Sequence, residues 1–179
     1  MENRIQIDAI CTATQEVFIT MLSDQVVPGE AYSERNASTN SEGVVALIGM
    51  TGAWIGTGIL MCPATLACKL SALLLMGEHP GTAVTEEVLD SVAEITNMII
   101  GNVKNLLEEH IGELNLSIPT VVYGRNLKTR SVNDGEWVIV PFECEGERLE
   151  VRLCLVPNTG KHSARPGFGL SHVVAPVVQ

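Results

Sequence analysis

Four residues between positions 90 and 101 have the types and the spacing to do chemistry at a protein surface: Asp90, Glu94, Asn97 and Gly101. At about 100° per residue they fall on one narrow arc of a helix. A carboxylate and a carboxamide one turn apart, followed a turn later by a residue without a side chain, form a flat strip that another protein can approach closely. Asn and Gly are poor helix formers, Gly costing about 1 kcal/mol relative to Ala, and a face that only had to stay in solvent could carry Lys, Gln or Ala instead.

These residues need a long helix to present them, and the pattern predicts one from about Thr85 to about His110. Thr85 is a suitable N-cap, Glu86 and Glu87 lie in the first turn where the helix dipole favours acids, and Gly112 follows the end. Nearly opposite the strip, an apolar stripe within about 80° is typical of the core side of a packed helix. That stripe comprises Val88, Val92, Ile95, Ile99, Val103 and Leu106.

The spacing Asp90-x-x-x-Glu94-x-x-Asn97 matches a known signature, [Asp/Ser]-x-x-x-Glu-x-x-Asn, of the CheC/CheX/FliY chemotaxis phosphatases. The phrase from residue 89 to residue 102 resembles that family throughout, and the likeness extends over about residues 5–157.

The first helix of the chain has only Asp8-x-x-x-Thr12-x-x-Gln15 at the equivalent places and lacks both the Glu and the Asn. CheC-like members carry the motif on both long helices, whereas CheX-like members have one copy per chain. The chain therefore resembles a CheX-like member.

That resemblance implies a phosphatase that hydrolyses the aspartyl phosphate of a CheY-type response regulator. Asn97 would orient the attacking water, as Gln does in GTPases. Glu94 would pair with the regulator's active-site Lys and fix the docking register. Asp90, at a position that also accepts Ser, and Gly101 would support docking. The resemblance further implies a homodimer with a shared sheet, no metal or cofactor of the chain's own, and Mg²⁺ in the partner regulator.

Two other functions stay open. One is a non-catalytic module of the same fold that docks to chemotaxis or flagellar-switch proteins. The other is an acidic ligand-binding or scaffold domain whose polar helix face is merely solvated. The presence of both Glu94 and Asn97 favours the enzyme, because a pure docking strip would not require the carboxamide.

The elements along the chain read as one structural unit used twice. A helix over residues 5–22, a polar loop over 28–42 and a hairpin that pairs 44–50 with 54–61 across Thr51-Gly52 are followed by a helix over 64–76. The long helix, a strand over 114–123 interrupted by Pro119, and a hairpin of 137–144 with 147–155 complete the second unit. We expect an α/β (α+β) fold with a pseudo-twofold repeat of long helix plus β-hairpin, the sheet packed against the long helices. We therefore expect a single domain over residues 1–157 and a C-terminal tail or arm over residues 158–179.

The second hairpin has a register that can be derived, because Glu145-Gly146 is a two-residue turn. Pairing 144 with 147 places Val138, Val140 and Phe142 opposite Leu149, Val151 and Leu153 on one face, and Glu143 opposite Arg148 on the other.

Composition limits the partners. A net charge of −10 disfavours nucleic acid, whose binders rely on Lys and Arg. The uncharged stretch 43–68 contains several Gly and a Pro and lacks flanking basic clusters, so we expect two strands and a helix start rather than a membrane span. The odd set of five Cys and the four His show no zinc or disulfide spacing. Without a signal-peptide pattern at the N-terminus, a cytoplasmic protein is expected.

Overall fold

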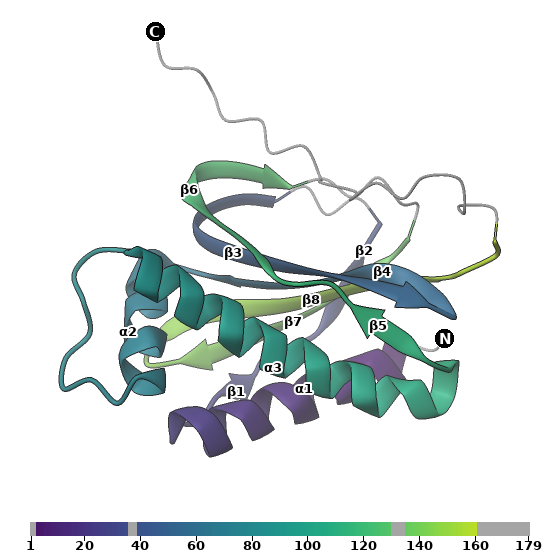
Figure 1. Cartoon of the computed structure of the whole chain (residues 1–179), viewed down its shortest axis with the longest axis horizontal. Helices are drawn as coiled ribbons and strands as arrows, with labels where there is room; N and C mark the ends of the chain where they lie inside the picture. Colours follow the sequence, from purple (N-terminus) through teal and green to yellow (C-terminus); the bar gives the residue numbers. More distant parts are fainter. Residues whose placement is uncertain (1–2, 36–38, 130–134, 161–179) are drawn as a thin grey trace, which may run out of the picture.

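A computed structural model of the chain describes residues 3–35, 39–129 and 135–160, and in parts of the adjoining strands it describes the backbone alone. Helices pack against one antiparallel sheet of long and short strands (Figure 1). The helical elements are α1 (Asn3–Val17), the π-helical turn η1 (Phe18–Leu22), α2 (Ala64–Leu74) and α3 (Glu86–Ile111). The strands are β1 (Val27–Pro28), β2 (Tyr32–Glu34), β3 (Thr39–Gly52), β4 (Trp54–Cys62), β5 (Leu114–Leu116), β6 (Thr120–Thr129), β7 (Trp137–Cys144) and β8 (Glu147–Pro157).

The sheet confirms the predicted pseudo-twofold repeat. Its order is β1-β7-β8-β4-β3-β5, with β2 also on β7 and β6 also on β3. The short strands that follow α1 therefore pair with the second hairpin, and those that follow α3 pair with the first. At the centre β4 and β8 run antiparallel, with Gly58 opposite Leu153. The two units are thus joined by exchanged edge strands as well as by the central pair.

The helices all lie on one face of the sheet (Figure 1). The main core joins their apolar sides to alternate strand residues such as Ala46 and Ile48 of β3, Leu60 of β4 and Val151 of β8. The intervening strand residues, among them Val45 and Ile59, form a second apolar cluster on the opposite face. Because both faces bury apolar side chains, the uncharged stretch is explained by strands, as expected.

Both hairpins form, and the predicted register of the second is confirmed. Cys144 pairs with Glu147, and Glu143 with Arg148. The first hairpin turns slightly later than expected, because Met50 pairs with Gly56. Residues 51 and 52 belong to β3, where β5 pairs with them. Pairing with β5 thus extends β3 to Gly52, beyond Met50, where the local turn residues predicted that the strand would end.

The prediction of a loop over residues 28–42 is wrong. This stretch contains the end of β1, all of β2 and the start of β3. Its polar sequence is compatible with strands because β1 and β2 are short edge strands on β7, where one side of the strand stays in solvent. The expected helix over 5–22 is confirmed as α1 with η1, and the interruption at Pro119 separates β5 from β6.

The expected tail over 158–179 falls almost wholly outside the described residues. Residues 158–160 are described and form a short turn after β8. In the described part of the chain, no helix is both long and apolar enough to cross a membrane.

Candidate functional site

Helix α3 begins and ends where its sequence requires. The Thr85 hydroxyl accepts a hydrogen bond from the Val88 N–H at 3.4 Å, which satisfies one of the free donors of the first turn. At the other end the Gly112 N–H donates to the Glu108 carbonyl at 3.0 Å, with φ at 83°, a conformation that favours glycine. These two caps stabilise the ends of the helix that carries the predicted strip.

The inner side of α3 is fully buried and is also tied down by hydroxyl groups. Ser91 donates to the Glu87 carbonyl at 2.8 Å and lies 2.9 Å from the Ser71 hydroxyl of α2. Thr96 donates to the Val92 carbonyl at 2.6 Å. Contacts with α2 and with the sheet therefore fix the rotation of α3 about its own axis, and with it the direction of the outer side.

One residue of the predicted core stripe is misplaced. Leu106 is 40% exposed, whereas Leu107 is fully buried. At 100° per residue Leu106 lies on the same side of the helix as Val88, so the change does not come from the helical period. It comes from packing, because the side of α3 that faces its neighbours rotates along this long helix and its last turns bury the next position instead. The other members of the stripe are buried as expected.

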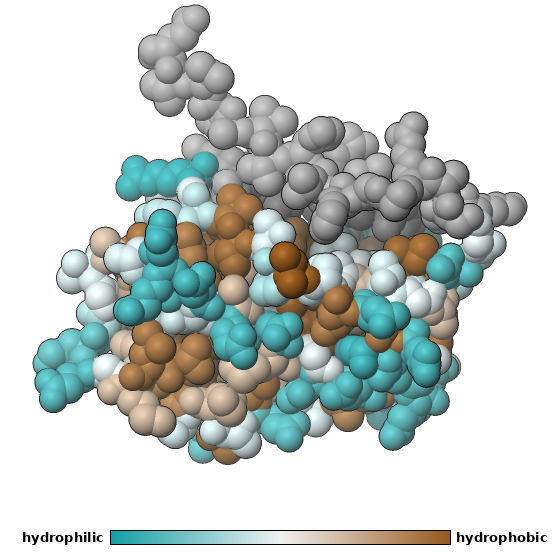
Figure 2. Space-filling model, in the orientation of Figure 1, coloured by the Kyte–Doolittle hydropathy of each residue, from teal (hydrophilic) through white to brown (hydrophobic). Residues whose placement is uncertain are grey.

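The predicted strip does lie outward on α3. Asp90, Glu94 and Asn97 are exposed, and a Cβ placed on half-buried Gly101 would meet nothing within 4 Å. From Asp90 to Gly101 the strip is about 16 Å long at 1.5 Å per residue. In Figure 2 a hydrophilic band follows the line that α3 takes in Figure 1, with apolar patches beside it.

The polar groups of the strip are uncommitted within the part of the chain that the structure describes. There, the side chains of Asp90, Glu94 and Asn97 have no hydrogen-bond or ion-pair partner. Two carboxylates and a carboxamide are therefore available together to a molecule that meets this side of the helix.

The strip continues beyond Gly101 to two residues that were not among the predicted ones. Lys104 and Glu108 follow Gly101 at the same spacing of three and four residues, which is the signal that could have found them. Their ion pair measures 3.0 Å, and the second oxygen of Glu108 accepts from the Leu114 N–H at 2.8 Å. These hydrogen bonds, first from Leu114 and then from Lys104, lower the pKa of Glu108. The pair closes the strip at the end of the helix.

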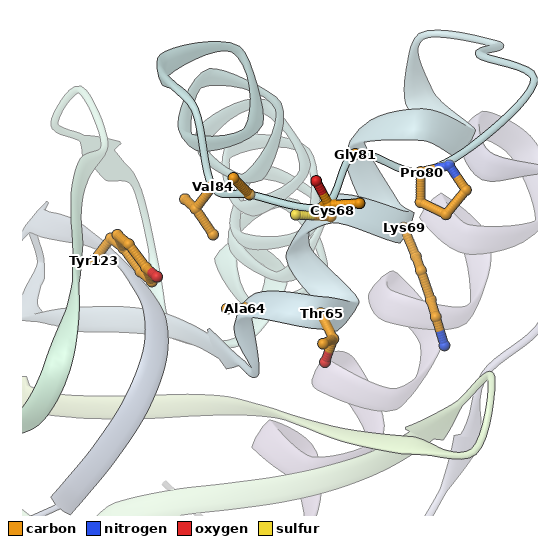
Figure 3. A pocket seen from close by; sticks show the side chains of 10 residues that line it. Ala64, Thr65, Cys68, Lys69, Pro80, Gly81, Val84 and Tyr123 are labelled. Carbon is orange, nitrogen blue, oxygen red and sulfur yellow. The ribbon is translucent and has the colours of Figure 1, made fainter.

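A pocket of about 240 Å³ lies apart from the strip, between the start of α2, the loop before α3 and Tyr123 of β6 (Figure 3). Lys69 is a cationic side chain on its rim, but it extends away from the pocket in the figure and pairs with Glu147 at 2.8 Å. That hydrogen bond raises the pKa of Lys69. The charge of Lys69 is thus directed to the end of the second hairpin rather than to a ligand in the pocket.

Among the residues that the structure describes, no group of three or more His, Cys, Asp or Glu is placed so that it could hold a metal ion. His79 and His110 are exposed. His162 and His172 lie outside the described residues.

Part of the chain matches the sequence model of a known protein family. The sequence model described as "Chemotaxis phosphatase CheX" matches residues 44–143, a range that includes the whole strip. A comparison with functionally curated proteins finds no significant match.

Solved structures share the fold over nearly their full length. A CheC-like superfamily protein from Shewanella sp. PV-4 has 28% identity and a TM-score of 0.74, the alignment covering 85% of this chain and 97% of that one. A chemotaxis protein CheX from Desulfovibrio desulfuricans has 25% identity and a TM-score of 0.74, covering 84% and 99%. The CheX of a CheX–CheY–BeF₃–Mg²⁺ complex from Borrelia burgdorferi has 22% identity and a TM-score of 0.65, covering 84% and 97%.

Proposed function

Because this chain belongs to the chemotaxis phosphatase CheX family, we propose that it hydrolyses the aspartyl phosphate of a CheY-type response regulator at the outer strip of α3. The observation that carries the proposal is the exposure of Glu94 and Asn97 together, without side-chain partners in the described part of the chain, on a helix whose other side is buried. Substrate and chemistry then follow from what these two groups can do.

Asn97 is proposed to act on the attacking water. An acyl phosphate is already activated, so the reaction needs a water molecule held in line with the bond that breaks. The carboxamide can accept one hydrogen bond from that water and donate another to a phosphoryl oxygen. Attack forms a bond from the water oxygen to phosphorus and breaks the bond from phosphorus to the aspartyl oxygen, releasing a free carboxylate and inorganic phosphate.

Glu94 is proposed to set the docking register. As an acceptor-only carboxylate it can pair with the regulator's active-site Lys, one turn from Asn97. Asp90 would support the same contact from the preceding turn, and the open space over Gly101 would let the regulator approach the helix backbone. The Mg²⁺ that neutralises charge on the phosphoryl group is expected in the regulator.

The Borrelia burgdorferi relative supports the choice of partner, since that CheX is in a complex with CheY, BeF₃ and Mg²⁺. A homodimer and a cytoplasmic location belong to the same proposal. Light scattering coupled to size exclusion measures the first, and a monomer at all concentrations would contradict it.

The test is the decay of a phosphorylated CheY-type regulator from the same genome, alone and with this protein. We expect faster decay with the wild-type chain. Asn97→Ala should abolish the acceleration while the melting temperature and the oligomeric state are retained. Glu94→Ala should weaken regulator binding as well as the rate.

Matched controls lie on the same helix. Asn105→Ala removes an exposed carboxamide two turns away, and Glu109→Ala removes an exposed carboxylate near the end. Both should leave the decay rate unchanged. If Asn97→Ala binds the regulator but the wild type does not accelerate decay, the non-catalytic docking function is correct instead. If no regulator is bound, the strip is a solvated face.

A further inference from the structure

Lys104 is a cationic side chain at the end of the strip, one turn beyond Gly101. Its ammonium lies 3.0 Å from the carboxylate of Glu108, one turn further along the helix, and 3.5 Å from the side-chain oxygen of Asn105. Lys104 and Glu108 are both partly buried, with 23% and 28% of their side chains exposed. The ammonium is therefore turned toward the C-terminal end of α3, away from the rest of the strip.

This direction is opposite to the usual one for a long side chain on a helix. Such side chains lean toward the N-terminus and lie over the residues three and four positions earlier. For Lys104 these residues are Gly101 and Ile100. Because a Cβ on Gly101 would meet nothing within 4 Å, the space over which Lys104 would ordinarily lean is open.

Glu108 can hold Lys104 because its own carboxylate is fixed. One carboxylate oxygen accepts a hydrogen bond from the Leu114 N–H at 2.8 Å, and the other accepts from Lys104. A Lys followed four residues later by a Glu is the less favourable order for an ion pair on a helix. The hydrogen bond from Leu114 offsets this disadvantage, since it orients the carboxylate toward Lys104. The same two donors, Leu114 first, lower the pKa of Glu108, so the carboxylate is charged at neutral pH.

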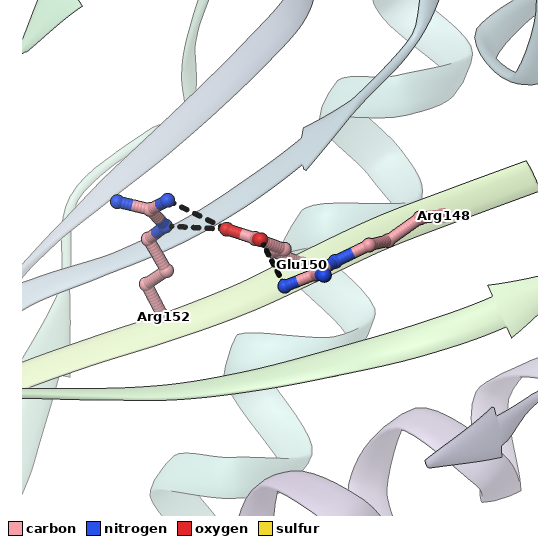
Figure 4. Close-up of polar contacts among 3 residues, drawn as sticks. All are labelled: Arg148, Glu150 and Arg152. Atoms are coloured by element: carbon pink, nitrogen blue, oxygen red, sulfur yellow. Dashed lines mark hydrogen bonds and ion pairs between the residues drawn. The ribbon is translucent and has the colours of Figure 1, made fainter. Parts of the chain in front are cut away.

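The ion pairs of β8 provide a contrast, because they lie on the face of the sheet turned away from the helices. Arg148 and Arg152 both donate to Glu150, at 2.7 and 2.6 Å (Figure 4). Alternate residues of a strand share a face, and the intervening Val151 belongs to the main core beneath the helices. These pairs join neighbours on one strand, whereas the pair of Lys104 with Glu108 borders the strip.

We propose that Glu108 is a positioning residue of the docking site, which keeps the ammonium of Lys104 out of the space above Gly101. This inference rests on the proposed function, in which the regulator's active-site Lys pairs with Glu94. Gly101 lies about 10 Å from Glu94 along the helix, close to the distance over which charges interact at physiological salt. A second cation above Gly101 would therefore repel the regulator's Lys, and it would fill the space through which the regulator approaches the helix backbone.

The test is the rate of dephosphorylation measured over a range of concentrations of the phosphorylated regulator, which separates KM from kcat. Glu108→Gln removes the charge that holds Lys104 and should raise KM roughly 3–10-fold with kcat unchanged. Combining Glu108→Gln with Lys104→Ala removes the released side chain and should return KM to near the wild-type value. A purely structural role of Glu108 predicts no such rescue, because Lys104→Ala restores neither the carboxylate nor its ion pair.

Two controls separate this effect from changes in overall charge and from the loss of any ion pair. Glu109→Gln makes the same change of charge at an exposed neighbour, and Arg148→Gln breaks an ion pair on the opposite face of the sheet. Neither should change KM. A KM for Glu108→Gln equal to that of Glu109→Gln would overturn the proposal, and so would a double variant whose KM stays raised.

Lys104→Ala alone covers the case in which Glu108→Gln does not fold, as judged by circular dichroism. It leaves Glu108 bonded to Leu114 and should keep the wild-type KM. A raised KM in this variant would overturn the proposal, because the ammonium would then itself contact the regulator. Failure of the proposed function is distinguishable, since the wild-type chain would then accelerate the decay of no regulator, whereas failure of this inference alone leaves the wild-type acceleration intact.

Discussion

Gly58 of β4 lies directly beneath Ile100 of α3, so close that a Cβ on the glycine would come within 2.6 Å of the Ile100 Cδ1. This contact sets the height of the helix above the centre of the sheet. Ile100 is the residue before Gly101, so the contact lies under the outer strip and couples the strip's position to packing in the core.

Gly58→Ala should therefore destabilise the protein, by about 1–3 kcal/mol, because Ile100 is fully buried and α3 must move to make room. Urea unfolding measures the loss. Ile100→Val shortens the side chain that would clash, so it should cost less in the Gly58→Ala background than in the wild type. Equal costs in both backgrounds would show that the two residues are not coupled.

Gly101→Ala should raise the free energy of unfolding by about 0.5–1 kcal/mol, since the added methyl group meets open space on a helix and alanine is the better helix former. Gly101→Trp should fold equally well yet weaken binding of the phosphorylated regulator, because it fills the space above the strip. Calorimetric unfolding and binding titrations measure the two effects. A loss of stability in the alanine variant would contradict the open surroundings of Gly101.

Acid should remove the stabilisation that Glu108 provides. Hydrogen bonds from the Leu114 N–H and from Lys104 lower the pKa of Glu108 in the folded protein. A lowered folded pKa contributes stability that is complete above the ordinary Glu value, about 4.3, and is lost as pH falls through the folded value.

Glu108→Gln should therefore lower the melting temperature at pH 7, and the gap to the wild type should close as the pH falls below about 4. Melting curves from pH 7 to 3 measure this gap. Glu109→Gln, a change at an exposed neighbour, is the control. A gap that widens in acid would contradict the assigned hydrogen bonds.

Only one of the five cysteines should react readily with thiol reagents in the native protein. Burial raises the pKa of Cys62 and of Cys144 to about 12 and that of Cys154 to about 11, and Cys68 is buried as well. Cys11 is half-buried. At pH 8 we expect one fast thiol, absent from Cys11→Ser, and four more after denaturation. Several fast thiols in the native protein would contradict the packing described for the sheet.

Local signals in the sequence determined the candidate strip and the two hairpins. The positions of Asp90, Glu94 and Asn97 follow from helical periodicity, which depends only on spacing and on the buried face opposite. The pairing of Cys144 with Glu147 follows from a two-residue turn, whose geometry sets the register of the strands on either side. Such features depend only on residues that lie close together in the sequence.

Only the tertiary structure decided how the two units combine. No local pattern shows that β1 and β2 pair with β7, or that β5 and β6 pair with β3, because such pairings depend on which free edges meet once the chain has closed its loops. The closeness of Gly58 to Ile100 and the burial of the second apolar cluster, on the sheet face opposite the helices, have the same origin. Each depends on residues far apart in the sequence that packing brings together.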